Sequence, residues 1–242
     1  MPKSDEMIKQ AHAALEQQPR VNLHRYPITI TAASDDSLML EGEVESVAAK
    51  KIALELTAAV AGVAGVVDRL RVAPSKVMGD GEISDHVRDA LLEDGAFARL
   101  AIRVRKGGKV ETASQPDTAG ANVIEIAVQA GVVTLDGRVP SYSHKALAGV
   151  LAWWVPGTRD VVNGLEIVPP QEIIDGDITD VLALVLERNP LVNADGITLR
   201  TRDLVVTLEG EVATEQESIA AEEDAWCIFA VNRVINHLSV HH

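Results

Sequence analysis

The pattern of apolar and polar positions repeats three times along the chain. One stretch, Val132 to Val168, opens with Leu-x-Gly-x-Val around Gly137 and closes with Asn-x-Leu-x-Ile. The closing positions, at 26, 28 and 30 residues after the glycine, recur after Gly42 and Gly210. Three copies in one register indicate an internal repeat, which divides the chain into modules of about 70 residues.

Each copy predicts a strand, a helix and a second strand. Leu135 and Val139 share one strand face, and their apolar character selects the core side. Gly42, Gly137 and Gly210 fall on that side too, so we interpret them as structural positions where the following helix lies close to the sheet. In the first copy the helix shows an apolar stripe formed by Ile52, Leu56, Ala59, Val60 and Val63.

A further helix and strand precede each unit. In the first copy a helix over 5–17 ends before Pro19, and strands follow at Ile28 and Leu38. The predicted fold class is α+β, with three tandem αββαβ modules, each a small mixed three-stranded sheet with two helices on one face. The predicted modules cover residues 1–75, 76–170 and 171–242.

The middle module contains an insertion at about residues 99–122. Its second half, 111–122, is rich in Ser, Pro, Thr and Gly and predicts a mobile loop. Its first half is a basic segment without acids, made of Arg99, Arg103, Arg105, Lys106 and Lys109. This segment either binds a phosphate-bearing partner or an anionic membrane, or it stays solvated or contacts the acidic third module.

Charge is unevenly distributed in a chain whose net charge is −14. The third module has 14 acids and 4 bases. Its predicted second helix carries the acids Glu215, Glu217, Glu222, Glu223 and Asp224. We interpret these acids as a solvated face that repels nucleic acid, so no nucleic-acid partner is expected.

Two tryptophans occupy one repeat position. Trp153 and Trp226 both lie 16 residues after the glycine, where the first copy has Ala58. This position is beside the apolar stripe, so we expect each ring to be only partly covered by its own module. The rings then either pack across a module boundary or contact a partner or a membrane.

Motifs of catalysis and cofactor binding are missing from the sequence: it has no P-loop, G-x-S-x-G, H-E-x-x-H or paired-cysteine spacing. The lone Cys227 follows the register of core positions, so we expect it to be buried and not reactive. The histidines form no i, i+4 pair, and His241 and His242 are either native residues or a truncated tag. We expect no enzyme activity and no cofactor.

No apolar run has the length of a signal peptide core or a membrane span. We therefore expect a cytoplasmic protein, or a periplasmic one if a signal peptide has been removed.

The repeat resembles the BON domain, the bacterial OsmY and nodulation module. The resemblance rests on Gly62–Val72 in the first copy, on Val132–Val139 with Gly157–Ile167 in the second, and on Val205–Val212 with Val231–Val240 in the third. The first copy departs from the pattern at Asp68, which replaces Asn, and the third lacks the Gly-Val pair. The chain is more similar to the leaderless proteins with several BON domains than to the periplasmic or lipid-anchored members of the family.

The resemblance implies a non-enzymatic binding module linked to envelope integrity and osmotic stress. We therefore expect a stress-related binding or assembly protein that associates with another protein, or with itself, through the faces bearing Trp153 and Trp226. The alternative is peripheral binding of anionic phospholipid through the basic segment Arg99 to Lys109. A relative linked to potassium sensing makes potassium or another ion a further implied ligand.

Overall fold

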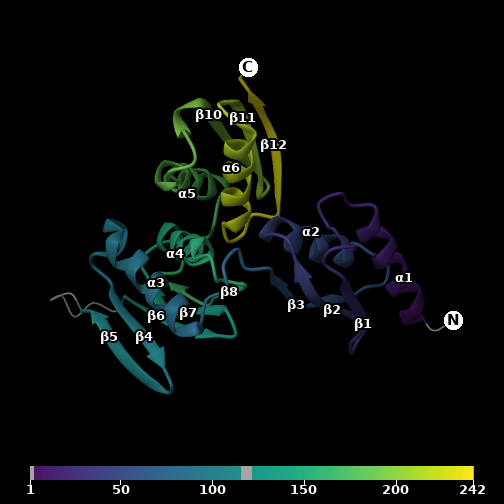
Figure 1. The fold of residues 1–242 in the computed structure, drawn as a ribbon, viewed down its shortest axis with the longest axis horizontal. Coiled ribbons are helices and arrows are strands. Elements are labelled where there is room, and N and C mark those ends of the chain that lie inside the picture. Colours follow the sequence, from purple (N-terminus) through teal and green to yellow (C-terminus); the bar gives the residue numbers. More distant parts are fainter. Residues whose placement is uncertain (1–2, 116–121, 242) are drawn as a thin grey trace. The chain divides into compact units, whose positions relative to one another are not determined.

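The computed structural model of the protein describes residues 3–115 and 122–241. Its contacts divide the chain into two compact units, Met1–Ala73 and Pro74–His242. The first unit contains the first copy of the repeat, and the second unit contains the other two (Figure 1).

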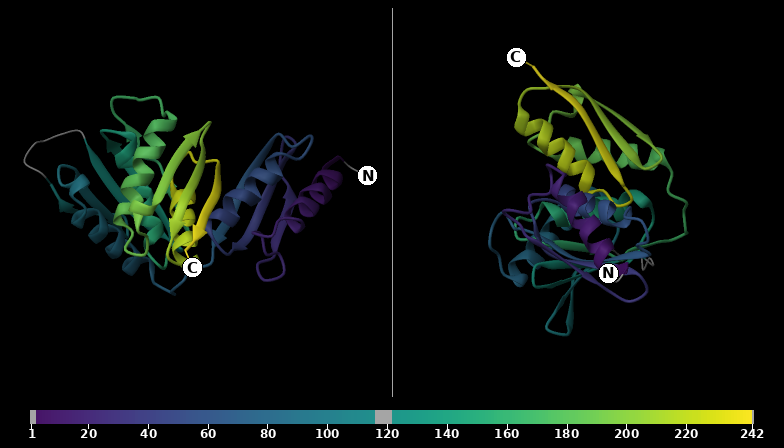
Figure 2. Two further views of the ribbon diagram at one scale, coloured as in Figure 1. Left: turned by 90° about the horizontal axis from the view of Figure 1, so that it is seen from above. Right: turned by 90° about the vertical axis from the view of Figure 1, so that its right-hand side faces the viewer.

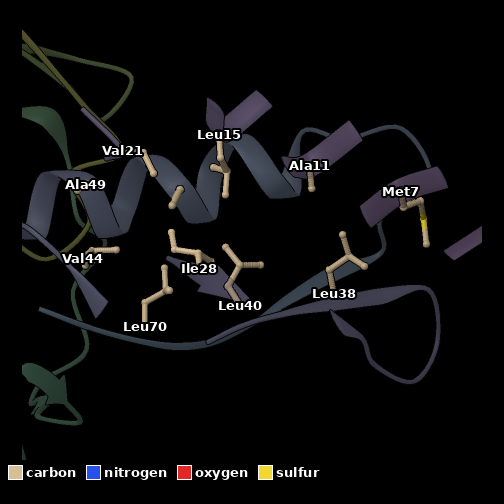
Figure 3. Packing of buried hydrophobic residues seen from close by; sticks show 11 residues of the cluster. Met7, Ala11, Leu15, Val21, Ile28, Leu38, Leu40, Val44, Ala49 and Leu70 are labelled. Carbon is tan, nitrogen blue, oxygen red and sulfur yellow. The ribbon is translucent and has the colours of Figure 1, made fainter. Parts of the chain in front are cut away.

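The first unit has the predicted αββαβ order. Its elements are α1 (Lys3–Glu16), β1 (Ile28–Ala32), β2 (Ser37–Val44), α2 (Val47–Ala58) and β3 (Gly65–Val72). The central strand β2 pairs antiparallel with β1 and parallel with β3. Figure 3 shows the core between the helices and the sheet, where Ala11 and Leu15 of α1 face Leu38, Leu40 and Leu70 of the strands.

Helix α2 turns a different face to this core from the one predicted. Its buried residues are Val47, Ala48, Ala49, Lys50, Ala53 and Thr57. Ala59, in the predicted stripe, is exposed, whereas Ile52 and Leu56 pack half-buried at the margin. Small alanine side chains let the helix approach the sheet closely, so the larger residues lie at its edges.

The third module repeats this plan. It consists of α5 (Asp175–Arg188), the short 3-10 helix η2 (Ala194–Gly196), β10 (Ile197–Arg202), β11 (Val205–Val212), α6 (Glu215–Cys227) and β12 (Arg233–Val240). Strand β11 pairs antiparallel with β10 and parallel with β12. Figure 2 shows β12, in yellow, alongside its neighbour β11.

The middle module departs from the predicted three-stranded sheet. Its elements are α3 (Asp80–Glu93), η1 (Gly95–Phe97), β4 (Ala101–Lys106), β5 (Lys109–Ser114), β6 (Val123–Gln129), β7 (Val132–Val139), α4 (Tyr142–Trp154), β8 (Asp160–Asn163) and β9 (Glu166–Ile167). The strands β5-β4-β6-β7-β8 form one sheet in this order, and β9 also pairs with β7. The described sheet has six strands.

The additional strands come from the insertion. Strands β4 and β5 form a hairpin, and β4 pairs parallel with β6, so the hairpin extends the edge of the sheet. The predicted mobile loop over 111–122 is therefore wrong for Glu111–Ser114, which belong to β5. Residues 116–121 of that predicted loop lie outside the described residues.

One side chain ties the closing strand of each module to its crossover helix. In the middle module, Asn163 Nδ2 donates to the backbone oxygen of Lys145 at 2.7 Å. In the third module, Asn236 Nδ2 donates to Ser218 Oγ at 3.0 Å. Each asparagine also accepts, through Oδ1, a hydrogen bond from the backbone two residues further on. We call this arrangement the closing clamp.

The first module builds the closing clamp with charge. Asp68 stands where the other modules have asparagine, and Lys50 Nζ lies 2.9 Å from its Oδ2. The same ammonium donates to the backbone oxygen of Leu70 at 3.1 Å. Lys50 is buried, with 6% of its surface exposed, so it supplies from the helix the donor that an aspartate lacks.

Each of the three repeat glycines lies where a side chain would collide with a backbone oxygen. Gly137 has a φ of +123°, and a Cβ atom there would lie 2.1 Å from the backbone oxygen of Val123 in β6. Gly42 and Gly210 have φ values of +147° and +128° and meet a backbone oxygen at the start of their own hairpins in the same way. The close contact is with the neighbouring strand, so the prediction that the crossover helix requires these glycines is wrong.

We expect Gly137→Ala to destabilise the middle module by about 1 to 3 kcal/mol, because alanine at this φ is strained and its Cβ collides with a backbone oxygen. Urea unfolding followed by tryptophan fluorescence measures this change. Gly95→Ala is the matched control, because an added Cβ there meets nothing within 4 Å. Equal unfolding midpoints for the two variants would contradict the assignment.

Candidate functional site

The hairpin β4–β5 carries most of the basic segment predicted from the sequence. Ile102 and Val104 of β4 are buried, while Arg103 and Arg105 alternate with them and lie on the opposite face of the sheet. A two-glycine turn joins the strands, with positive φ at both residues. The hairpin therefore presents its arginines on the face away from the buried core.

Two of the five predicted bases are already ion-paired. Arg105 pairs with Glu125 of the adjacent strand β6. Lys106 Nζ lies 2.7 Å from Asp85 Oδ1 of α3, and the hydrogen bond from Lys106 lowers the pKa of that carboxyl. These two bases serve mainly to fix the hairpin to the rest of the module.

The other three bases, Arg99, Arg103 and Lys109, form no ion pair within residues 3–115 and 122–241. Arg99 and Lys109 are exposed and Arg103 is half-buried. The candidate surface is therefore smaller than the five-base patch predicted from sequence. We call these three residues and the exposed residues of β5 the hairpin surface.

The predicted equivalence of Trp153 and Trp226 does not extend to their burial. Trp226 is buried, with 2% of its surface exposed, and its indole Nε1 donates to Glu222 Oε1 at 3.3 Å. Trp153 is half-buried. Trp226 is not accessible to a partner, which leaves Trp153 as the half-exposed ring of the two.

A different tryptophan joins the middle and third modules. Trp154 Nε1 donates to Asp224 Oδ1 of α6 at 2.8 Å. The other oxygen of this carboxyl accepts from Asn189 Nδ2 at 2.6 Å. Burial raises the pKa of Asp224 to about 6, although both hydrogen bonds favour the charged form.

Further contacts join the same two modules. Arg188 of α5 pairs with Asp94, with 2.6 Å between Nε and Oδ2. Burial opposes ionisation of Asp94, but the hydrogen bonds from Arg188 and from the backbone of Ala96, together with the charge of Arg188, outweigh it, so the pKa of this carboxyl is lowered. Tyr142 donates to the backbone oxygen of Phe229, whose ring lies 4.5 Å from Lys145 Nζ. We call these contacts and the Trp154 contact the module junction.

Only part of the solvated acidic face predicted for α6 is present, because Glu215 is exposed and Glu223 is half-buried whereas the other three acids are not accessible. Glu217, Glu222 and Asp224 are buried. Glu217 accepts hydrogen bonds from the backbone of Asn193 and Ala213 at the start of the helix. A run of acids without bases is typical of a solvated helix face. The buried acids of α6 instead accept hydrogen bonds from segments distant in the sequence, and the spacing of the acids does not reveal those donors.

The sequence pattern does not predict the polar contacts of the module junction, which are made by Trp154, Asp224, Asn189, Arg188 and Asp94. The sequence does contain one indication of this junction. Trp154 occupies the repeat position of Ala59 in the first copy, so the shared fold does not require a large ring at this position. Cys227, predicted to be buried at the equivalent position, is partly exposed.

In the part of the chain that the structure describes, no three His, Cys, Asp or Glu side chains are placed to hold a metal ion. His241 belongs to this part, whereas His242 lies outside the described residues. None of the described helices is both long and apolar enough to cross a membrane.

We expect Asp224→Asn to remove a pH dependence of stability. The raised pKa means that the protonated carboxyl stabilises the fold, fully below about pH 4 and progressively less as the pH rises to about 6. The wild type should therefore lose up to about 3 kcal/mol relative to the variant across this window. Urea unfolding at several pH values, followed by tryptophan fluorescence, measures the difference.

The exposed acid Asp180 of α5 provides the control, because Asp180→Asn changes the same charge outside the junction. Its unfolding should follow the wild type at each pH. A constant stability difference between wild type and Asp224→Asn would show that this carboxyl keeps its ordinary pKa in the folded protein.

Comparisons with solved structures give only distant likenesses. The C-terminal domain of CdsD, the structural protein of the type III secretion system of Chlamydia trachomatis, is 14% identical, with 98% of each chain covered and a TM-score of 0.26. The PrgH periplasmic domain is 9% identical, with 96% of this chain and 100% of that chain covered and a TM-score of 0.24. The curated proteins include no match.

The family comparison is specific. The BON domain model matches residues 6–74, 113–169 and 174–241. The middle match begins within β5, so α3 and β4 lie before it. Because the matches cover more than half of the chain, the protein belongs to the BON domain family and contains three tandem BON domains.

Proposed function

We propose that this chain is a non-catalytic, stress-related binding protein whose second and third modules form one platform and whose recognition surface is the hairpin surface. BON domains are in general non-catalytic, which supports a binding or assembly role. The link to osmotic stress follows the family resemblance. The proposed partner is another protein chain.

The observation that carries this proposal is the hairpin β4–β5 itself. The first and third modules have three-stranded sheets, so the hairpin is an addition to the shared fold. The module needs Lys106 to pair with Asp85 and Arg105 to pair with Glu125, but it does not use Arg103 or Lys109 in this way. Side chains that the fold does not use are available to a partner.

The module junction supports the platform. Polar contacts from Trp154 and Asp94 in the middle module meet Asp224 and Arg188 in the third. Asp94 and Asp224 are largely withdrawn from solvent, so the charged hydrogen bonds that join the modules are shielded from water, which strengthens them. The platform holds the hairpin surface in a fixed orientation, which lowers the entropy lost when a partner binds.

The alternative partner is an anionic phospholipid surface. Arg99, Arg103 and Lys109 would provide the attraction, at about 1 kcal/mol per base near such a surface. The net charge of −14 opposes this attraction, and 14 acids and 4 bases in the third module add to the repulsion. We therefore favour a protein partner.

A photoreactive amino acid at Val110 tests the proposal in living cells. Val110 is 44% exposed and pairs across the hairpin with Arg105, so the probe lies on the hairpin surface and leaves its bases intact. We expect protein adducts that increase at raised osmolarity, detected by gel mobility and mass spectrometry. The same probe at Thr198, an exposed residue of the edge strand β10 in the third module, is the matched control.

Adducts of equal yield from Val110 and Thr198, or none from Val110, would contradict a role for the hairpin surface. Lipid adducts at Val110 without protein adducts would favour the phospholipid alternative.

A further inference from the structure

Strand β5 forms an open edge of the middle sheet. It pairs with β4 and lies at the end of the strand order, as Figure 1 shows. Lys109 to Ala113 are all exposed. An edge strand presents backbone N–H and C=O groups that no neighbour has taken, so it is a template for another strand.

Two opposite charges stand two residues apart on this edge. Lys109 lies directly opposite Lys106 across the hairpin, and Lys106 already pairs with Asp85. Neither Lys109 nor Glu111 has an ion pair within the described residues. The hairpin therefore has one unpaired cation and one unpaired anion on the same face of its outer strand.

The geometry of antiparallel pairing selects one register for two copies of this strand. In an antiparallel pair each residue lies directly opposite one residue of the other strand. When the two strands are identical and related by a two-fold axis, this axis passes between one residue and its own copy, and we name the register after that residue. An axis at Val110 places Lys109 of each copy opposite Glu111 of the other. An axis at Glu111 places two carboxylates together, and an axis at Thr112 places Glu111 opposite Ala113, so only the axis at Val110 pairs the charges.

We propose that two copies of this chain associate through β5, antiparallel about Val110, so that their middle sheets become continuous. This inference rests on the proposed function, because it names a second copy as the partner of the hairpin surface. The pairing gives two Lys109–Glu111 ion pairs by symmetry. It also covers Val110, which is 44% exposed in the single chain, with the same residue of the other copy.

Charge on an edge strand usually prevents pairing, because like charges meet. Here the charges favour pairing, because a lysine and a glutamate flank one residue. When two copies pair antiparallel about that residue, each lysine lies opposite the glutamate of the other copy. Cross-strand pairs of opposite charge stabilise a sheet, and like charges directly opposite destabilise it.

Reciprocal charge exchange in the full chain tests the proposal by analytical sedimentation. The unmodified chain should show a concentration-dependent equilibrium between monomer and dimer. Lys109→Glu and Glu111→Lys should each raise the dimer dissociation constant by about tenfold or more, because each places two like-charged pairs at the interface. The double variant restores opposite charges and should return to within about threefold of the unmodified chain.

The two single variants together distinguish an effect of net charge from an effect of strand pairing. Lys109→Glu makes the chain more acidic and Glu111→Lys makes it less acidic, so a net-charge effect would move the two dissociation constants in opposite directions. Pairing through β5 moves them in the same direction. Both residues are exposed, and matching thermal unfolding would verify that the variants fold.

A chain that stays monomeric throughout, or single variants that dimerise like the unmodified chain, would overturn the proposal. If Val110 captures a different protein while the chain is monomeric, the hairpin surface keeps its proposed function and only the self-pairing fails. A dimer that the double variant does not recover would also overturn the register.

Discussion

The closing clamp is the interaction on which each module depends. A crossover unit has two parallel strands and one helix, and the second strand is held to its neighbour along one edge only. The side chain 26 residues after the repeat glycine adds a second attachment, from the closing strand to the helix above it. Because Oδ1 of the same side chain also binds the backbone of its own strand, the clamp fixes the strand as well as the helix.

The three modules attach the closing strand to the helix with different chemical groups. Asn163 reaches a backbone oxygen, and Gly149 of α4 makes the approach possible, since a Cβ there would lie 2.9 Å from Asn163 Nδ2. Asn236 binds Ser218 and also Glu222. Asp68 uses the ammonium of Lys50. An aspartate in this position would be unfavourable without its lysine, so the departure from the asparagine pattern is compensated on the helix.

The local pattern was sufficient to predict the αββαβ order, because strand and helix periodicities are properties of consecutive residues. The local pattern also predicted which residues of the three copies are equivalent. The structure agrees, since Leu40, Leu135 and Leu208 each pair with the clamp residue of their own module. The hairpin was missed although Ile102 and Val104 alternate with arginines. We interpreted the arginines as a charged patch, and the pairing of β4 with β6 is a contact that local sequence does not reveal.

The candidate site was predicted less well, because burial there depends on a neighbouring module. Trp153 and Trp226 share a repeat position, yet only Trp226 is fully buried. The acids of α6 were interpreted as solvated, whereas Asp224 meets Trp154 of the middle module. Repeat analysis describes what the modules share, and the hairpin surface and the module junction are the features that they do not share.

The closing clamp is one structural requirement met in three ways, so the chemistry of one module should serve in another. Exchanging the first clamp for the third, with Lys50→Ser and Asp68→Asn, tests this claim by urea unfolding followed by circular dichroism. Lys50→Ser alone should destabilise the first unit by about 1 to 3 kcal/mol, because Asp68 and the backbone oxygen of Leu70 lose the donor that Lys50 provides, whereas the double exchange should recover most of that loss. A double variant as unstable as the single one would contradict the claim.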